Sequence, residues 1–385
     1  MITSIIKRYW GKKTYAEIGK MTGQTAEGVR KMGRKTLKLP PIRKNKQNVT
    51  LSPEKEIERD VVLGNLESAG KHTQKKYDLV CSKLADAEEI IEAYKTVSTA
   101  NTYTIQPNRN GKKGEATAVA VLSDIHYAET VKSDNVNGKN EYTPKIAKAR
   151  LESFFVNLVK LIKIFKKHSK INDLVLALLG DMINGHLREE ALENNSMSPI
   201  EEMLEIKGIL EAGIKYVLDN TDVNITLPCH SGNHARDTKK VRPSTEAAHS
   251  YEYVLYHVLS SEFKGNKRVK FIIPTSYHSF IDIGGLTVRF HHGHFMKYGG
   301  GVGGIYISVN KAIAQWNKIQ HADLDVFAHF HQLRDGGNFV SNGSVIGWNE
   351  FAVSIKADFE KPKQAFFLVD HKRKEKTSSS HIFLS

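Results

Sequence analysis

Five short polar segments each follow an apolar, strand-like run, and this arrangement constrains the fold more than any other feature of the sequence. The segments are DIH at 124–126, GD at 180–181, GNH at 232–234, HGH at 292–294 and HFH at 329–331. A strand that ends in such residues delivers their side chains to the carboxyl edge of a sheet, where open α/β folds build their sites. The pattern therefore predicts alternating strands and helices around one cluster of polar side chains.

The side chains in these segments indicate a metal site. They are carboxylates, imidazoles and one amide, a donor set that suits manganese, iron, zinc or magnesium rather than a soft metal. Asp124 and His126 lie two residues apart at a strand end and can bind one ion together, while Asp181 could bridge two ions. Two ions about 3.5–4 Å apart can clamp a phosphate and neutralise the charge that develops during in-line attack.

The joint order of the five segments resembles the calcineurin-like metallophosphoesterase superfamily, whose members share D-x-H, GD, GNH[D/E], H and GH-x-H motifs. The resemblance covers roughly residues 116–370, and SNGSV at 341–345 is similar to an element that often follows the last motif. It implies a four-layer α/β/β/α sandwich with mixed sheets. It also implies hydrolysis of a phosphoester, in which a metal-bound hydroxide attacks the phosphate in line.

The resemblance also implies which residues hold two divalent ions, with manganese expected ahead of iron, zinc and magnesium. The ligands would be seven side chains at the five strand ends: Asp124, His126, Asp181, Asn233, His292, His329 and His331. Asp181 would bridge the ions. The first ion would be held by Asp124, His126 and His331, and the second by Asn233, His292 and His329. His234 would be catalytic instead, stabilising the transition state or protonating the leaving oxygen.

The sequence departs from the family after the GNH segment, where an acidic residue that usually orients the histidine is replaced by Ala235. Arg236 could bind a phosphate there, or Asp237 could replace the missing acid, and the sequence does not decide between them. Asn184 and His294 are further candidates for substrate contacts. A helix cap or loop hydrogen bond for Asn184, and a histidine that merely lines the site for His294, fit the sequence equally well.

The first forty residues predict a small all-α domain of three helices. Thr14 and Glu17 form a capping box for the second helix, Gly23 lies in a tight turn, and Thr25 caps the third helix. The stretch TYAEIGKMTGQTAEGVRK resembles helix-turn-helix domains of transcription regulators and transposases. In such domains the second helix of the motif enters the major groove. The side chains implied to face DNA are Gln24, Thr25, Arg30, Lys31 and Arg34. A trihelical protein-interaction domain is the alternative.

The net charge of +14 is concentrated at the same end of the chain. Residues 1–50 hold 13 Lys and Arg against 2 Asp and Glu, a net charge of +11, which leaves +3 for the other 335 residues. A basic excess confined to one end suggests a module that binds a polyanion, and DNA is the expected partner. A basic tail kept for solubility would have the same composition.

Four segments are expected along the chain. Residues 1–40 form the helix-turn-helix-like domain, 41–114 a linker with one or two helices, 115–372 the metallophosphoesterase domain and 373–385 a C-terminal tail. The linker helices could self-associate and make a homo-oligomer. With only Cys81 and Cys229 there is no disulfide framework, and no apolar run is long enough to span a membrane. No signal peptide is recognisable, so we expect a cytoplasmic protein without a membrane partner.

Together these features predict a DNA phosphodiesterase or nuclease whose catalytic domain is tethered to DNA by the basic N-terminal domain. Two alternatives remain open from the sequence. One is a phosphodiesterase or phosphatase for cyclic or signalling nucleotides, and the other is a DNA-binding regulator that uses the phosphoesterase fold only as a scaffold.

Overall fold

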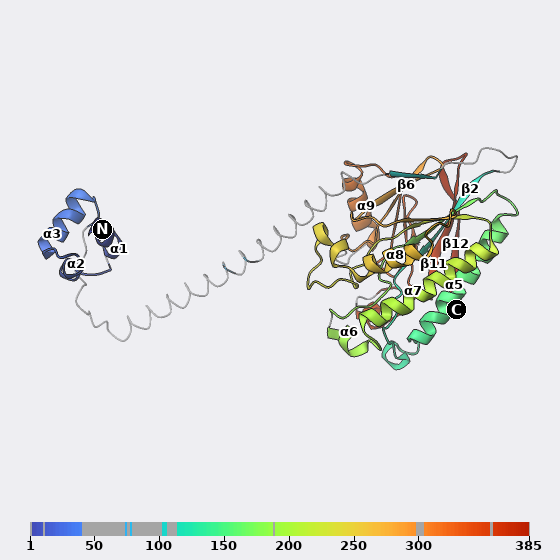
Figure 1. Cartoon of the computed structure of the whole chain (residues 1–385), viewed down its shortest axis with the longest axis horizontal. Coiled ribbons are helices and arrows are strands. Elements are labelled where there is room, and N and C mark those ends of the chain that lie inside the picture. The colour runs from blue at the N-terminus through green and yellow to red at the C-terminus, as the bar shows by residue number, and fades with distance from the viewer. Residues whose placement is uncertain are drawn as a thin grey trace. The chain divides into compact units, whose positions relative to one another are not determined.

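The structure is a computed structural model that describes most of the first forty residues and most of the chain from residue 114 onward. The described residues are 2–10, 12–40, 74, 78, 102–105, 114–187, 189–297, 304–354 and 357–384. They belong to two compact units, Met1–Cys81 and Ser82–Ser385. Figure 1 shows the first unit as a small group of helices and the second as a larger assembly of strands and helices.

The N-terminal unit contains the three expected helices, so the all-α prediction is confirmed. They are α1 (Ile2–Tyr9), α2 (Tyr15–Thr22) and α3 (Ala26–Lys31), and α3 continues into the π-helical segment η1 (Met32–Thr36). Ile6, Ile18 and Val29, one from each α-helix, are fully buried against one another. This small core fixes the three helices because each contributes an apolar face to it.

The turns of this unit form as the capping residues predict. The Thr14 hydroxyl oxygen accepts a hydrogen bond from the Glu17 amide, and the Glu17 carboxylate accepts one from the Thr14 amide at 2.8 Å. Gly23 ends α2 with a φ of 69°, a left-handed conformation that glycine adopts without strain. The Thr25 side chain then caps α3 by accepting a hydrogen bond from the Gly28 amide. Local sequence is thus sufficient to define these helix ends.

The C-terminal unit is built on two six-stranded mixed sheets. The first sheet has the order β12-β11-β2-β3-β4-β5. Its strands are β2 (Ala116–Leu122), β3 (Asp173–Leu178), β4 (Asn224–Pro228), β5 (Val269–Ile272), β11 (Lys363–Asp370) and β12 (Glu375–Phe383). Strands β2 to β5 are parallel, whereas β11 runs antiparallel to both β2 and β12. The carboxyl ends of β2, β3 and β4 therefore share one edge.

The second sheet has the order β1-β6-β7-β8-β10-β9. Its strands are β1 (Thr102–Ile105), β6 (Ser279–Ile283), β7 (Leu286–Phe290), β8 (Leu324–Phe327), β9 (Arg334–Asp335) and β10 (Phe339–Ser341). Strands β7, β8 and β10 are parallel, and β6 forms an antiparallel hairpin with β7. In this sheet, too, the ends of β7 and β8 lie at a common edge.

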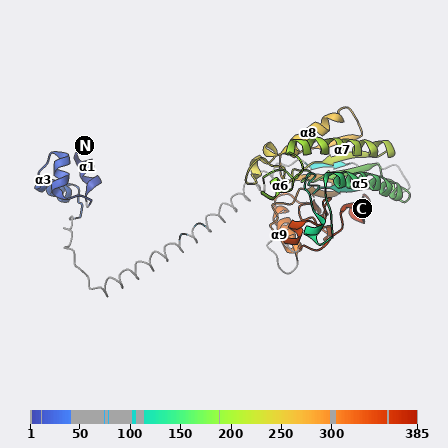
Figure 2. The ribbon, with the colours of Figure 1, turned by 90° about the horizontal axis from the view of Figure 1, so that it is seen from below.

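Three apolar clusters define four layers. Side chains such as Val119 and Val175 of the first sheet pack against Val288 and Val326 of the second, which makes the central core. The outer face of the first sheet is covered by α5 (Pro144–Phe165), α7 (Pro199–Asn220) and α8 (Tyr251–Glu262). Helix α9 (Ile305–Trp316) covers the outer face of the second sheet. Figures 1 and 2 show the long helices α5 and α7 side by side. The expected α/β/β/α order is therefore confirmed.

Short elements complete the unit. They are η2 (Ser133–Val136), α6 (Glu189–Asn194), η3 (Pro243–Thr245), η4 (Ala247–His249) and α10 (Glu350–Ser354). The 3-10 turns η3 and η4 precede α8, which begins at Tyr251. None of the helices in the described ranges is long and apolar enough to cross a membrane.

Two segment boundaries differ from the sequence-based expectation. Residues 373–385, expected as a tail, contain β12, whose polar, alternately exposed residues form an edge strand paired with the apolar β11. Residues 102–105, expected in the linker, form β1 and pair in parallel with β6. The expected linker helices, and any oligomer formed through them, lie outside the described residues except for Gln74 and Asp78.

Two glycines of α7 provide a matched test of the packing between α5 and α7. A Cβ at Gly208 would meet nothing within 4 Å, whereas one at Gly213 would lie 2.1 Å from Phe155 Cε2. Gly208→Ala should stabilise the protein by up to about 1 kcal/mol because alanine favours helix. Gly213→Ala gains the same preference but must displace the buried Phe155 ring, which costs about 1–3 kcal/mol. Urea unfolding followed by circular dichroism should show that difference, and equal stabilities would contradict this packing.

Candidate metal centre

The five polar segments meet at one edge of the sandwich. The segments after β2, β3 and β4 belong to the first sheet, and those after β7 and β8 to the second. Three overlapping triads have ligand atoms that all lie within 4.8 Å of one another. They are Asp124–His126–His331, His126–Asp181–His234 and Asp181–His292–His329. The structure thus brings together residues that are separated by up to about two hundred positions in the chain.

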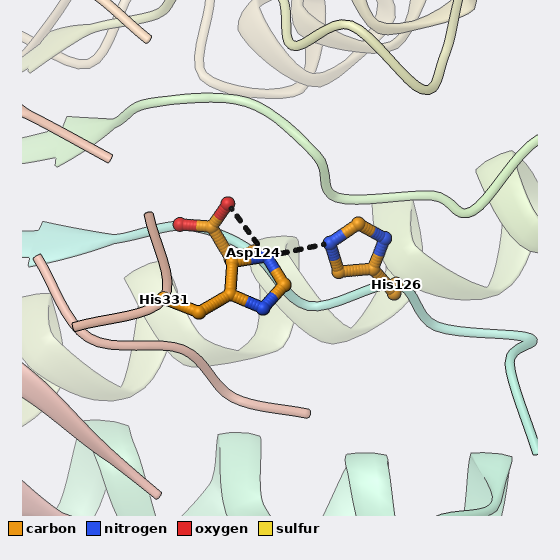
Figure 3. Close-up of side chains that lie close together, drawn as sticks. All are labelled: Asp124, His126 and His331. Carbon is orange, nitrogen blue, oxygen red and sulfur yellow. Dashed lines mark hydrogen bonds and ion pairs between the residues drawn. The ribbon is translucent and has the colours of Figure 1, made fainter. Parts of the chain in front are cut away.

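The first triad joins both sheets. Its three side chains converge in Figure 3, where His331 lies between Asp124 and His126. His331 Nε2 is 3.4 Å from Asp124 Oδ1 and 3.2 Å from His126 Nε2. Asp124 is fully buried and His126 is almost so. This is the group that the resemblance assigns to the first ion.

The other two triads share Asp181. Its Oδ2 atom lies 3.2 Å from His292 Nε2 and 4.0 Å from His126 Nε2. Asn233, which belongs to the same expected set, places Oδ1 3.1 Å from His292 Nε2. Asp181 thus belongs to two of the three triads and also lies 4.0 Å from His126 of the first.

The ring nitrogens of the histidines are arranged as metal ligands would be. His126 Nδ1 lies 3.1 Å from Asn184 Oδ1, and His292 Nδ1 lies 2.6 Å from the Leu179 carbonyl oxygen. Both oxygens can only accept, so each Nδ1 carries the proton and each Nε2 presents a lone pair to the centre. His126 Nε2 also faces His331 Nε2 at 3.2 Å. A cation between them would satisfy both, so these residues fit a divalent ion.

The charges in the centre support one another in the metal-free protein. Burial alone would raise the pKa of Asp181, but the neighbouring His292 and His234 hold it well below its ordinary value. Burial and the nearby His292 lower the pKa of His329 well below its ordinary value. Asp124 outweighs the effect of burial on His331 and raises its pKa. An ionised Asp181 in the middle of the cluster is suited to bind cations, and a bound cation would replace the proton that the raised pKa of His331 favours.

Backbone strain is concentrated at the same place. Among the described residues, eight that are not glycine have positive φ, and five of them belong to the triads. These five are Asp124, His126, Asp181, His329 and His331, with φ between 48° and 73°. A left-handed backbone costs about 1–3 kcal/mol at such residues and persists where the surrounding fold enforces it. The strain therefore indicates that the side-chain positions are selected for function.

The glycines of the GD and GNH segments allow two loops to pass at very short distance. A Cβ at Gly180 would lie 2.3 Å from the Gly232 amide nitrogen, and one at Gly232 would lie 2.1 Å from Asp181 Oδ1. Gly180 also has a φ of 84°, which side chains disfavour. Any larger residue at either position would push Asp181 away from the histidines.

Asn184 takes the place of the acidic residue that the GNH segment lacks. Its Oδ1 atom lies 3.0 Å from His234 Nδ1 and also bonds to His126, while its Nδ2 group donates to Asn195 Oδ1 at 2.7 Å. The bond to Asn195 fixes the amide orientation, so Oδ1 must face the two histidines. The structure thus gives Asn184 an orienting role through hydrogen bonds within the loops, whereas its expected contact with substrate stays a prediction.

Two buried glutamates hold the ligand-bearing loops. Glu252 of α8 accepts hydrogen bonds from the amides of Met182 and Gly232 at 2.5 and 2.7 Å. Glu202 of α7 accepts one from the Asn184 amide at 2.7 Å. Burial raises the pKa of Glu252 to about 8 and that of Glu202 to about 7. Sequence reasoning missed both because each lies on a helix remote from the motifs, where a glutamate usually faces solvent.

A polar network orients Asp124. Ser123 Oγ donates to Asp124 Oδ2 at 2.6 Å and accepts from Asn342 Nδ2 at 2.8 Å. Asn342 is part of the SNGSV segment, and the Val345 amide of that segment also donates to the Asp124 carbonyl at 3.0 Å. The segment that resembles the element after the last family motif thus supports the first ligand.

Three other candidates lie beside the centre and outside its triads. The Arg236 guanidinium donates to the carbonyl oxygens of Asn233 and Thr238. Asp237 is exposed, and its Oδ1 atom lies 2.8 Å from His249 Nδ1. His294 Nε2 is 3.0 Å from Glu246 Oε1, and its ring centroid is 5.4 Å from that of His292.

Comparison with solved structures finds several chains that match over most of their length at low identity. No family model and no curated protein matches the sequence. The chain is similar to a Vps29 mutant from Entamoeba histolytica, with 12% identity, 69% of this chain and 97% of that chain covered, and a TM-score of 0.28. It is also similar to a hypothetical protein from Pyrococcus horikoshii, with 15% identity, 69% of this chain and 86% of that chain covered, and a TM-score of 0.33. A third similar structure is a protein serine/threonine phosphatase from Saccharomyces cerevisiae, with 10% identity, 78% of this chain and 90% of that chain covered, and a TM-score of 0.28. Such low scores establish neither substrate nor activity.

Replacing the shared carboxylate should separate the two metal positions. Asp181→Asn keeps the shape of the side chain but removes its charge, so metal loading should fall from about two ions per chain to one or fewer. Plasma emission spectrometry after equilibration with Mn²⁺ and desalting measures the content. Asp237→Asn, which neutralises an exposed carboxylate nearby, should keep full loading. An Asp181→Asn protein that still retains both ions would argue against the bridging role.

Proposed function

We propose that this protein is a dinuclear metal-dependent phosphoesterase. The observation that carries the proposal is the sharing of Asp181 between two triads, one built on the first sheet and the other joining both sheets. Carboxylate and imidazole ligands around such a bridge suit two divalent ions, with manganese ahead of iron, zinc and magnesium. When bound, the ions would polarise the phosphoester and activate water for attack.

The residues around the metal ligands supply the remaining chemistry. The side chain of His234 lines the cavity above the centre, and its Nδ1 faces the Asn184 oxygens. Nδ1 must therefore carry a proton, and Nε2 is the nitrogen left for the substrate. In the doubly protonated ring, Nε2 can donate a proton to the leaving oxygen as the bond to phosphorus breaks. Water supplies the new oxygen on phosphorus, so a diester yields a monoester and an alcohol.

Removing His234 should slow the chemical step without removing metal. His234→Ala should lower kcat for bis(p-nitrophenyl) phosphate by about 10²–10⁴-fold while the Mn²⁺ content stays unchanged. Chelation of the wild-type protein should abolish turnover. The control is His321→Ala, at a side chain that is 68% exposed, and it should leave kcat unchanged. Wild-type kcat in the His234→Ala protein would contradict the role as general acid.

DNA is the substrate that the N-terminal unit favours. All five side chains expected to face DNA are exposed, and they lie from the end of the turn to η1: Gln24, Thr25, Arg30, Lys31 and Arg34. Thr25 also caps α3, and Arg30 also pairs with Glu27 on the same helix. Lys31 and Arg34 are therefore the pair whose removal disturbs the helix least. The proposed activity is cleavage of DNA phosphodiesters by a catalytic unit tethered through these contacts.

Two pairs of basic residues, one pair in each unit, allow the proposed binding of DNA by the N-terminal unit to be tested. Replacing Lys31 and Arg34 by alanine should weaken DNA binding and reduce the salt dependence of log K by about one per lost phosphate contact. The matched control replaces the exposed Lys372 and Arg373 between β11 and β12. Filter binding at several salt concentrations, with Mn²⁺-dependent cleavage of linear, single-stranded and circular DNA, measures both steps. Turnover of bis(p-nitrophenyl) phosphate without any DNA cleavage would exclude DNA as the substrate.

A further inference from the structure

A cavity of about 220 Å³ opens directly above the metal centre. Its floor includes Asp181 and His331, and its walls come from residues that are not among the metal ligands. These residues belong to the loop after β2, to helix α6, and to helix α10 with the residue before it. Pockets for drug-sized ligands usually measure about 300–1,000 Å³, so this one suits a smaller group held beside the reacting phosphate.

The walls are acidic. Glu129, Glu193 and Glu350 are the glutamates that line the cavity. Among the described residues that line this cavity there is no lysine or arginine. The metal ions would neutralise only the phosphate on the floor. A second phosphate on the substrate would therefore lie against like charges, which is an effective means of rejecting it.

The other lining groups accept and donate hydrogen bonds or present an aromatic face. Asn135 Nδ2 donates to Glu350 Oε1, and Asn349 Nδ2 donates to Glu129 Oε1, each at 3.0 Å, which holds these carboxylates in place. Phe351 of α10 lines the same cavity and is 44% exposed. Carboxylates accept from sugar hydroxyls and base amino groups, and an aromatic ring stacks on a nucleobase.

Resting on the proposed phosphoesterase function, we infer that the cavity holds one terminal nucleoside of the substrate and that its carboxylates exclude a further phosphate. The reacting group is then a nucleotide ester or the end of a nucleic acid strand. Hydrolysis breaks the bond between phosphorus and the leaving oxygen, and water supplies the oxygen on phosphorus and the proton on the alcohol. Cleavage at internal positions of a strand is disfavoured because the nucleoside in the cavity would then carry a further phosphate, which the carboxylates repel.

Two esters that differ by one phosphate test the inference. They are the p-nitrophenyl ester of thymidine 5′-phosphate and the same ester with an added 3′-phosphate, assayed with Mn²⁺ beside bis(p-nitrophenyl) phosphate. The wild type should favour the first ester by tenfold or more in kcat/KM. Combined Glu193→Gln and Glu350→Gln should reduce that ratio at least fivefold. Glu152→Gln, on α5, should leave it unchanged.

Binding gives a readout that is independent of turnover. Calorimetry with Mn²⁺ should show thymidine 5′-phosphate binding at least tenfold more tightly than thymidine 3′,5′-bisphosphate. The combined Glu193→Gln and Glu350→Gln variant should show a smaller difference in affinity between these two ligands. Equal kcat/KM for the two esters in the wild type, or an unchanged ratio in that variant, would overturn the inference while leaving the phosphoesterase intact. Failure to hydrolyse any of the three esters would instead contradict the proposed function and the inference with it.

Discussion

A carboxylate buried as deeply as that of Asp181 must be paired with positive charge or hydrogen-bond donors, because desolvation otherwise favours its neutral form. In this protein His292 approaches one oxygen and the His234 amide donates to the other at 2.9 Å. Glu252 holds the loop that carries Asp181 and the loop that carries His234, by accepting hydrogen bonds from the Met182 and Gly232 amides. Helix α8 on the first sheet thus helps, through Glu252, to hold the loops that surround the ionised side chain of Asp181.

The fold reaches this arrangement at a local energetic cost. Left-handed residues carry five of the ligands, and the loops after β3 and β4 pass each other with room only for glycine. Such strain persists only when surrounding structure enforces it, and the apolar clusters on both faces of the first sheet supply that enforcement. Stability elsewhere in the sandwich therefore maintains a geometry that the loops alone would not adopt.

The sequence was sufficient to predict the strand ends, because each ligand directly follows an apolar run and strand direction then determines which edge it reaches. The α/β/β/α layers and the three N-terminal helices were likewise predictable from periodicity, capping residues and family resemblance. Asn184 was named without its orienting role, since that role depends on where Asn195 and His234 lie in space. Strand β12 was missed because a polar edge strand lacks the apolar pattern that marks buried ones.

Each of the two ligand groups expected to hold an ion draws on both sheets. Asp124 and His126 follow a strand of the first sheet, and His331 follows one of the second. Asp181 belongs to the first sheet, whereas His292 and His329 belong to the second. Bound ions would therefore act as reversible cross-links between the halves of the sandwich. Their binding free energy would add to the cohesion of the central apolar layer, so the availability of metal would set how tightly the sheets are held together.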